Sequence, residues 1–342
     1  MIDIKLLEQL CLCNGISGDE GNVRNLIINE IKDCADDIKT DNLGNLIVFK
    51  KGKKSAKSKL MVSAHMDEVG LMVTDITSDG YLKFDEVGGI DRRVLPGKRV
   101  CVGRNGLNGV IGVKPIHLSN GDEKTAVPKM NDMYIDIGAE SREDALKYVN
   151  YGDSINFEGD FKINGKTVVT KALDDRFGCY VLIILIKSEP EYDMYFTFVV
   201  QEEVGLRGAR PAAFTVNPDF ALVIESTTAA DVAEVDASHQ VCNLSKGATV
   251  TVMDRATVYD KEMISAAFEL AEKNNIAVQY KRAVAGGNDS GAIHQSRGGV
   301  RTLAVSLPSR YIHAPSTAAN LDDCESVLKL AKVLSDYIAG GN

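Results

Sequence analysis

The sequence predicts an α/β fold in which a small β-barrel-like domain interrupts a larger domain of alternating strands and helices. Near both ends of the chain, apolar runs of strand length alternate with amphipathic stretches of helix length. From about 70 to 157 the pattern changes to short β-like runs separated by Gly, Asn and Asp turns. With 342 residues the chain is long enough for two domains, which we expect at 1–69 plus 158–342 and at 70–157.

The first 65 residues predict two helices, a hairpin and a buried strand. A short amphipathic helix is expected over 3–14. Ser17 and Glu20 have the spacing of a capping box, and the apolar residues that follow recur at helical intervals up to Ile31, so a second helix of about four turns is expected there. A β-hairpin is expected around Leu43-Gly44, a solvated loop over 53–58, and a strand over 60–65.

The remaining elements follow the same two patterns. Between 70 and 157 only one brief helix is expected, over 141–149. From about 158 the α/β alternation returns. There we expect helices over 176–188, 261–275 and 321–338, and strands over 194–200, 220–226 and 301–309.

Charge and hydropathy exclude several classes of partner. Lys and Arg number 39 and Asp and Glu 48, which gives a net charge of −9. An acidic chain is a poor match for nucleic acid or for an anionic membrane. The strongest apolar run, 180–186, is too short to span a bilayer, and the N-terminus lacks the pattern of a signal peptide. We therefore expect a cytoplasmic protein.

The seven cysteines predict neither a disulfide framework nor a thiolate metal site. Their number is odd, their spacing is irregular, and no C-x-x-C pair occurs in the sequence. We expect most of them to be small buried apolar side chains.

Histidines and acids follow the apolar runs at the points where strands are expected to end. In open α/β sheets, ligands bind outside the carboxyl ends of the strands. Side chains from four strand ends are therefore expected to converge in one crevice, together with Asp174 before the helix at 176–188. The strand-end residues are His65, Asp67, Glu202, Glu203, Glu225 and His313.

Each of these residues taken alone also has a plain structural interpretation. Asp174 and Asp175 could cap a helix, and the Glu202-Glu203 pair could be solvated. His65 could be an ordinary core histidine, and His313 an ordinary loop residue. The combination favours a metal site, because histidine and carboxylate ligands without cysteine suit Zn²⁺, Co²⁺ or Mn²⁺.

The number of candidate ligands points to two divalent metal ions. Two histidines and three carboxylates exceed what one open tetrahedral site requires. A carboxylate that bridges two ions would hold them about 3.5–4 Å apart, as in two-metal hydrolases. Two adjacent glutamates at the edge of a core repel each other, and bound cations would offset that repulsion.

Six motifs, in their order along the chain, resemble those of the tetrahedral (TET-type) dinuclear metallo-aminopeptidases, whose members are also called glutamyl aminopeptidase or endoglucanase M. The resemblance implies a mixed-sheet α/β/α catalytic domain, a PDZ-like inserted dimerisation domain, peptide substrates, and homo-oligomers from dimers to tetrahedral dodecamers. The motifs are HMDEVGLMV (65–73), KALDDRFGC (171–179), QEEVGLRGA (201–209), IESTTAAD (224–231), GGNDSGAIH (286–294) and SRYIHAPS (309–316).

The resemblance also implies a role for each candidate residue. Asp174 would bridge the two ions, Glu202 would be the general base, and Asp67 would orient a histidine ligand. His65 and Glu225 would bind the first ion, and Glu203 and His313 the second.

Three residues and three rival functions stay open at this stage. Asp289 is expected either to be held by structural hydrogen bonds or to contact substrate, and His117 and His239 are expected to be ordinary surface residues. The rivals are a glycoside hydrolase of the endoglucanase type, a dinuclear deacylase, and a metal-binding assembly subunit without catalytic activity. Aromatic residues for sugar stacking are scarce, at 6% with no Trp, which counts against the first.

Overall fold

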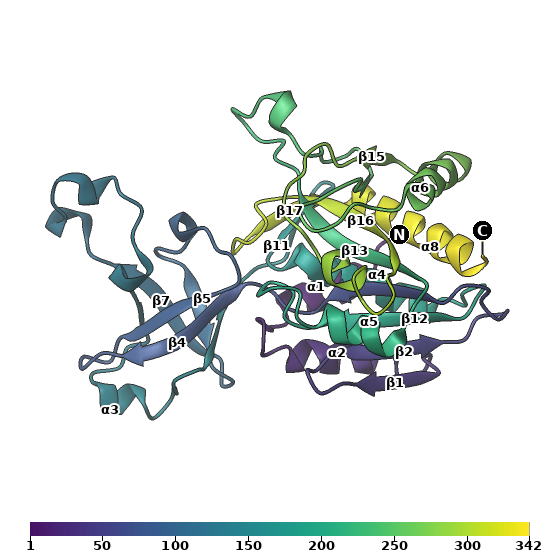
Figure 1. Cartoon of the computed structure of the whole chain (residues 1–342). Coiled ribbons are helices and arrows are strands. Elements are labelled where there is room, and N and C mark those ends of the chain that lie inside the picture. Colours follow the sequence, from purple (N-terminus) through teal and green to yellow (C-terminus); the bar gives the residue numbers. More distant parts are fainter. Residues whose placement is uncertain (342) are drawn as a thin grey trace.

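The computed structural model describes residues 1–341, apart from the side chain of Glu123; Asn342, the last residue of the larger expected domain, lies outside the described residues. It has a mixed α/β sheet flanked by helices and a six-stranded antiparallel barrel that is inserted into it (Figure 1). The α/β fold with a small inserted β-barrel predicted from the sequence is therefore confirmed. The helices are α1 (Ile4–Leu12), α2 (Gly21–Ile31), α3 (Arg142–Ala145), α4 (Leu173–Lys187), α5 (Ala209–Val216), α6 (Lys261–Lys273), α7 (Ser290–Ile293) and α8 (Leu321–Ala339).

The large sheet has eleven strands within the described residues, nine of them in the order β1-β2-β12-β3-β13-β16-β17-β11-β10. β14 pairs with β16 and β15, beside this path. The strands are β1 (Asp37–Thr40), β2 (Leu46–Lys50), β3 (Leu60–His65), β10 (Lys162–Asn164), β11 (Thr167–Thr170), β12 (Met194–Val199), β13 (Phe220–Thr228), β14 (Ala248–Val250), β15 (Val278–Tyr280), β16 (Arg301–Arg310) and β17 (Thr317–Asn320).

Four central strands of this sheet run parallel and end at the same edge. β12, β3, β13 and β16 pair in parallel, with Val199 opposite His65 and Glu225 opposite Ser306. Their residues are almost continuously buried, as expected for parallel strands with both faces covered. α4 packs on β3 and β13, while α5 and α7 pack together and contact β12 and β16, respectively. The carboxyl ends of these four strands therefore bring four separate chain segments together.

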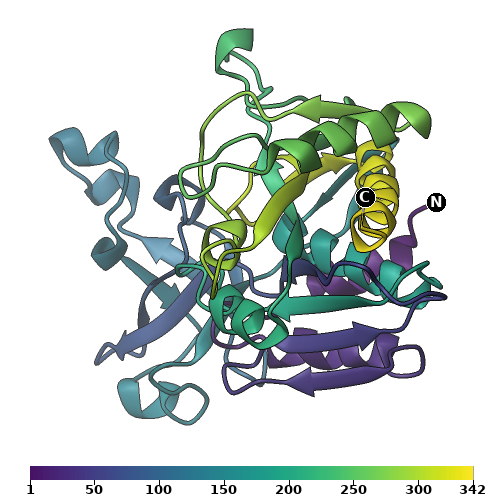
Figure 2. The same cartoon turned by 45° about the vertical axis from the view of Figure 1, so that its right-hand side comes forward.

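The inserted barrel is closed and has its own core. Its strands follow the order β4-β5-β8-β7-β6-β9, and all their pairings are antiparallel. The N-terminus and the C-terminal end of α8 lie on the side of the larger part away from the barrel (Figures 1 and 2). The barrel strands are β4 (Gly70–Ile76), β5 (Leu82–Val87), β6 (Arg99–Val102), β7 (Leu107–Val113), β8 (Met133–Asp136) and β9 (Ser154–Phe157).

The capping box predicted for the second helix is wrong. Glu20 stands at the N-cap of α2, but it makes no side-chain capping bond to that helix. Its carboxylate instead accepts hydrogen bonds from the main-chain N–H groups of Gly18 and Gln201. Ser17 donates its hydroxyl proton to Asp67, at 2.6 Å. Both side chains tie the loop before α2 to the ends of β3 and β12, because these buried acceptors and donors need partners.

A buried arginine fixes the segment that follows β3. Arg176 is fully buried, and its guanidinium donates to four main-chain carbonyls and to Glu68. Lys171 also pairs with Glu68, at 2.7 Å. Buried charges are tolerated when they are paired and hydrogen-bonded in this way. The carbonyls belong to Leu10, Cys13, Gly15 and Met66.

We expect Arg176→Met to lower the free energy of unfolding by about 3–5 kcal/mol, because it leaves buried acceptors without their donor. Urea titration followed by circular dichroism measures the loss. Arg210→Met, at an exposed position on α5, is the matched control and should cost less than about 0.5 kcal/mol. Equal small losses in both variants would contradict a structural role for Arg176.

Candidate metal centre

Asp174 lies between the two histidines, with one carboxylate oxygen toward each. Its Oδ1 is 3.4 Å from Nε2 of His65, and its Oδ2 is 3.5 Å from Nε2 of His313. Glu225 lies on the His65 side, with Oε2 at 3.7 Å from the same Nε2. Glu203 lies on the His313 side, at 3.2 Å. The two sides share Asp174, so the cluster has the form of two adjoining sites.

At the beginning of α4, the neighbouring residues Asp174 and Asp175 have different contacts. Asp174 and Asp175 have non-helical backbone angles within α4, and the peptide bond between them is cis. Asp175 accepts hydrogen bonds from the main-chain N–H groups of Gly178 and His65. A Cβ at Gly178 would lie 2.2 Å from an Asp175 oxygen, so that position requires glycine. Helix capping therefore applies to Asp175, while Asp174 faces the histidines.

Asp67 contacts Nδ1 of His65, the ring nitrogen on the side away from Asp174. This nitrogen lies 3.0 Å from the main-chain carbonyl oxygen of Asp67 and 3.5 Å from the carboxylate of the same residue. The nearer acceptor is thus the main chain, whereas the sequence pointed to the carboxylate. In a neutral imidazole, a hydrogen bond donated by Nδ1 leaves the lone pair on Nε2, the nitrogen that faces Asp174 and Glu225.

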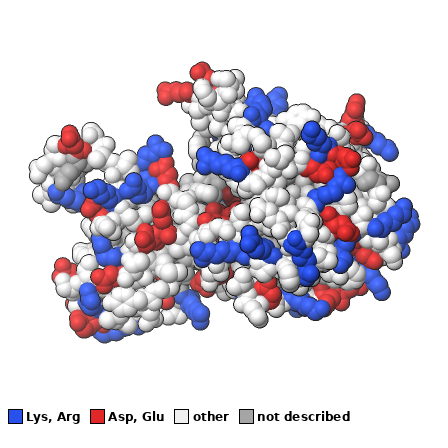
Figure 3. Space-filling view, viewed as in Figure 1, with Lys and Arg blue, Asp and Glu red and all other residues white. Residues whose placement is uncertain are grey.

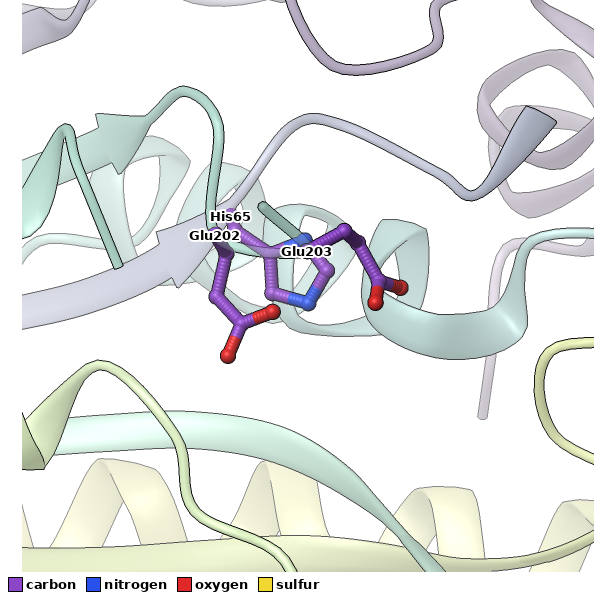
Figure 4. A group of neighbouring side chains, drawn as sticks. All are labelled: His65, Glu202 and Glu203. Atoms are coloured by element: carbon purple, nitrogen blue, oxygen red, sulfur yellow. The ribbon is translucent and has the colours of Figure 1, made fainter. Parts of the chain in front are cut away.

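The Asp67 carboxylate organises the paired glutamates. Its oxygens accept from the main-chain N–H groups of Glu202 and Glu203, at 3.0 and 3.1 Å, and from Ser17. In Figure 4 the two glutamate side chains diverge on either side of the His65 imidazole. The structure thus brings together the seven residues singled out in the sequence. Ser17 was missed in this role, because nothing in its local pattern distinguishes it from a helix cap.

The donor atoms of the cluster suit divalent cations. Three groups of His and acid side chains place one donor atom each within 4.8 Å of one another: His65 with Glu202 and Glu203, His65 with Asp174 and Glu225, and Asp174 with Glu203 and His313. Among the described residues, Oδ1 of Asp174 and Oε1 of Glu225 are buried without a hydrogen-bond partner. Buried carboxylate oxygens without partners are costly, and a cation would supply the missing interaction.

Burial makes the three glutamates of the cluster difficult to ionise, whereas His313 and His65 outweigh burial at Asp174 and hold its pKa below the usual range. Burial raises the pKa of Glu202 and of Glu225 well above the usual range, and neighbouring carboxylates add to the effect. Burial also raises the pKa of Glu203, although His313 opposes it. A bound cation would reverse these shifts, since a nearby positive charge favours the ionised carboxylate.

Burial and the neighbouring carboxylates shift the pKa of each histidine in opposite directions. Burial lowers the pKa of each, but Glu225 and Asp174 hold the pKa of His65 well above its usual range. For His313 the contacts with Asp174 and Glu203 outweigh burial and raise the pKa to about 11. The imidazoles therefore act as partial substitutes for metal charge within the cluster.

The two histidines whose role the sequence left open lie outside the candidate metal groups. His117 and His239 are exposed in short 3₁₀ turns, at 116–118 and 237–239. Among the described side chains, neither belongs to a group of three that could hold a metal ion.

Known proteins similar to this chain point to one family. The family described as M42 glutamyl aminopeptidase matches residues 44–330. A lysyl aminopeptidase of Pyrococcus furiosus is 34% identical over 99% of this chain and 98% of its own. A TET aminopeptidase structure from Thaumarchaeota archaeon SCGC AB-539-E09 has 33% identity and a TM-score of 0.92, and covers 97% of this chain and 95% of its own.

A third relative bears on assembly. The TET1 peptidase of Pyrococcus horikoshii, described as assembling into a tetrahedron or a large octahedral shell, is 40% identical with a TM-score of 0.85. The match covers 97% of this chain and 98% of that one.

The shifted pKa values predict that the chelator-treated protein loses stability as the pH rises. A carboxyl with a raised folded-state pKa, such as Glu225, destabilises the folded state increasingly above its ordinary value of 4.5. A histidine with a raised pKa, such as His313, contributes stability below 6.5 that is lost as the pH rises towards 11. Both effects have the same sign.

Urea unfolding in EDTA between about pH 5 and about pH 8 tests this expectation. Glu225→Gln removes one titrating group, so its unfolding free energy should fall less steeply with pH, by at most about 1.4 kcal/mol per pH unit. Identical slopes for the two proteins would show that Glu225 does not titrate as described.

Proposed function

The chain belongs to the M42 glutamyl aminopeptidase family and is a metallo-aminopeptidase, a hydrolase; from this we propose that it removes N-terminal residues from peptides at a site for two divalent ions. The observation that carries the two-ion proposal is the position of Asp174, whose two oxygens face two different histidines. A carboxylate in that position suits a bridging ligand.

The remaining ligands divide between the two sides of Asp174. His65 and Glu225 would hold the first ion, and Glu203 and His313 the second. Zn²⁺ and Co²⁺ fit this set of imidazole and carboxylate donors, and Mn²⁺ is a third candidate. When bound, such ions supply an acidified water nucleophile and polarise the peptide carbonyl.

Glu202 is the proposed general base and acid. Glu202 is the neighbour of Glu203 in the sequence. Within the described structure, Glu203 contacts His313, and no such contact is found for Glu202. Burial raises its pKa and bound cations would lower it again, and a carboxylate beside the ions is suited to take and return a proton. Its carboxylate would take a proton from the attacking water and pass it to the leaving amine. Asp67 would fix the relative positions of Glu202 and His65, because it contacts both residues.

Self-association is the second part of the proposal. The Pyrococcus horikoshii relative is described as assembling into a tetrahedron or a large octahedral shell. We propose that this chain also forms homo-oligomers, from dimers to a tetrahedral dodecamer, with the catalytic part at 1–69 plus 158–342 and a dimerisation domain at 70–157.

The proposal includes no nucleic acid or membrane partner. In Figure 3 basic and acidic side chains are interspersed over the visible face. Within residues 1–341, no helix has both the length and the apolar character needed to cross a bilayer. Peptides are thus the proposed substrates, and a cytoplasmic location fits them.

We expect Glu202→Gln to lower kcat by about 10²- to 10⁴-fold, because the amide keeps the shape of the side chain but cannot accept the proton. Steady-state hydrolysis of aminoacyl-p-nitroanilides measures the loss, and elemental analysis should find the metal content unchanged. Full activity would rule out Glu202 as the base, whereas loss of bound metal would make it a ligand.

EDTA should abolish hydrolysis of aminoacyl-p-nitroanilides, and Zn²⁺, Co²⁺ or Mn²⁺ should restore it, because no residue of the cluster replaces an ion in activating water. The same samples are assayed on carboxymethylcellulose and on N-acetylated amino acids. EDTA-resistant cleavage of cellulose would favour the glycoside hydrolase, which needs two carboxyls and no metal. Activity confined to the acetylated set would favour the deacylase.

A further inference from the structure

A groove lies between the inserted barrel and the loop that follows β16, and one of the candidate metal ligands lines it. Its volume is about 790 Å³, and its walls come from residues 86–94 of the barrel and 311–314 of the loop. A Cβ atom added to Gly89 would lie 3.9 Å from Nδ1 of His313, so the barrel approaches this ligand closely. The groove therefore leads to the His313 side of the cluster.

The two sides of the cluster differ in how open they are. The side chains of His65 and Glu225 are 1% and 5% exposed, whereas that of His313 is 39% exposed. A second cavity beside the cluster, lined in part by Asp174, Glu203 and His313, has a volume of about 10 Å³, which is room for about one water molecule. Of these two cavities, only the groove is large enough for a peptide chain.

Tyr311 is a large exposed side chain on the wall of this groove, and the loop that carries it has an unusual backbone. The φ angles of Tyr311 and His313 are +62° and +61°, a left-handed conformation that is unfavourable for residues other than glycine. Arg310 pairs with Asp231 at 2.7 Å, and the hydroxyl of Thr317 donates to the main-chain carbonyl of Tyr311 at 3.3 Å. Strained loops of this kind occur where they position functional side chains.

We propose that the groove binds the substrate residue that follows the scissile bond, and that Tyr311 packs against the side chain of that residue. The inference rests on the proposed aminopeptidase function. On the amino side of the scissile bond there is a single residue, whereas the leaving peptide can have any length. The leaving peptide therefore needs an open groove that begins at the cluster, and this groove begins at His313.

The groove favours a large apolar side chain at this second position of the substrate. Packing apolar surface against an aromatic ring is favourable. Arg93 also lines the groove, but its guanidinium donates to Asp91 at 2.8 Å, so its charge is already paired. Glu86 is the other acid of the wall, which makes a basic second residue the alternative. The apolar side chains beside Tyr311 are those of Ile90, Val94 and Ile312.

The test compares two tripeptides that differ only in the second residue, Leu-Phe-Gly and Leu-Gly-Gly. Their kcat/KM values are measured from the release of leucine by the metal-loaded wild type and by Tyr311→Ala. The wild type should prefer the phenylalanine peptide. The substitution should lower this preference about 5- to 20-fold, because the aromatic contact is lost. Damage to the catalytic site that lowers both values equally does not change their ratio.

Tyr148→Ala is the matched control, because Tyr148 and Tyr311 are 58% and 59% exposed, but only Tyr311 lines the groove. The control should leave the ratio of the two kcat/KM values unchanged. Tyr311→Phe keeps the ring and should retain the preference, which separates packing from hydrogen bonding by the hydroxyl. If Tyr311→Ala does not fold, Tyr311→Asn replaces it, because asparagine tolerates the left-handed conformation.

An unchanged ratio in Tyr311→Ala, or no preference in the wild type, would overturn the proposal. A changed ratio between Phe-Gly-Gly and Leu-Gly-Gly, with the second-position preference intact, would also overturn it and assign the groove to the first residue. A wild-type preference for Leu-Lys-Gly that Glu86→Gln abolishes would replace apolar packing by charge recognition. All these outcomes leave the aminopeptidase function standing, whereas no hydrolysis of any peptide with any metal would refute that function as well.

Discussion

Carboxylates gathered in a buried place need positive charge, and this requirement shapes the edge of the sheet. Asp174 divides its two oxygens between His65 and His313, while Glu225 and Glu203 stand on either side. Without cations, burial raises the pKa of both glutamates. The arrangement is electrostatically reasonable only if cations complete it, because burying a carboxylate without a partner is costly.

The surrounding fold keeps this unfavourable cluster in place. Parallel strands deliver their carboxyl ends to one edge, which is where open α/β sheets bind ligands. Behind that edge, Asp67 holds the backbone of the glutamate pair, and Arg176 holds the carbonyl of Met66 between His65 and Asp67. The candidate ligands are thus positioned by hydrogen bonds to main-chain atoms, which restrict their movement away from one another.

Most of the candidate site residues could be predicted from the sequence, because an apolar run gives way to polar residues where a strand ends. At β12, a mostly apolar run ends at Val200, and Gln201 and two glutamates follow. Polar residues follow apolar runs in the same way at His65 and Glu225. The boundary of the antiparallel insert was visible for a similar reason, since its turns are rich in glycine. Short elements such as α7 and β14 were not predicted, because a few residues carry too little periodicity.

Side-chain contacts between segments far apart in the sequence could not be predicted from local sequence patterns. The spacing of Ser17 and Glu20 fits a capping box, yet tertiary partners take both side chains. The sequence likewise leaves structural and substrate roles open for Asp289, and nothing in its motif shows that its side chain is buried.

The most direct test of the two-ion centre is an anomalous difference map from crystals of the wild-type protein grown with Zn²⁺, recorded at the zinc absorption edge. The account predicts two peaks about 3.5–4 Å apart with one oxygen of Asp174 next to each. His65 and Glu225 should contact one peak, and Glu203 and His313 the other. A single peak, or peaks away from Asp174, would contradict it.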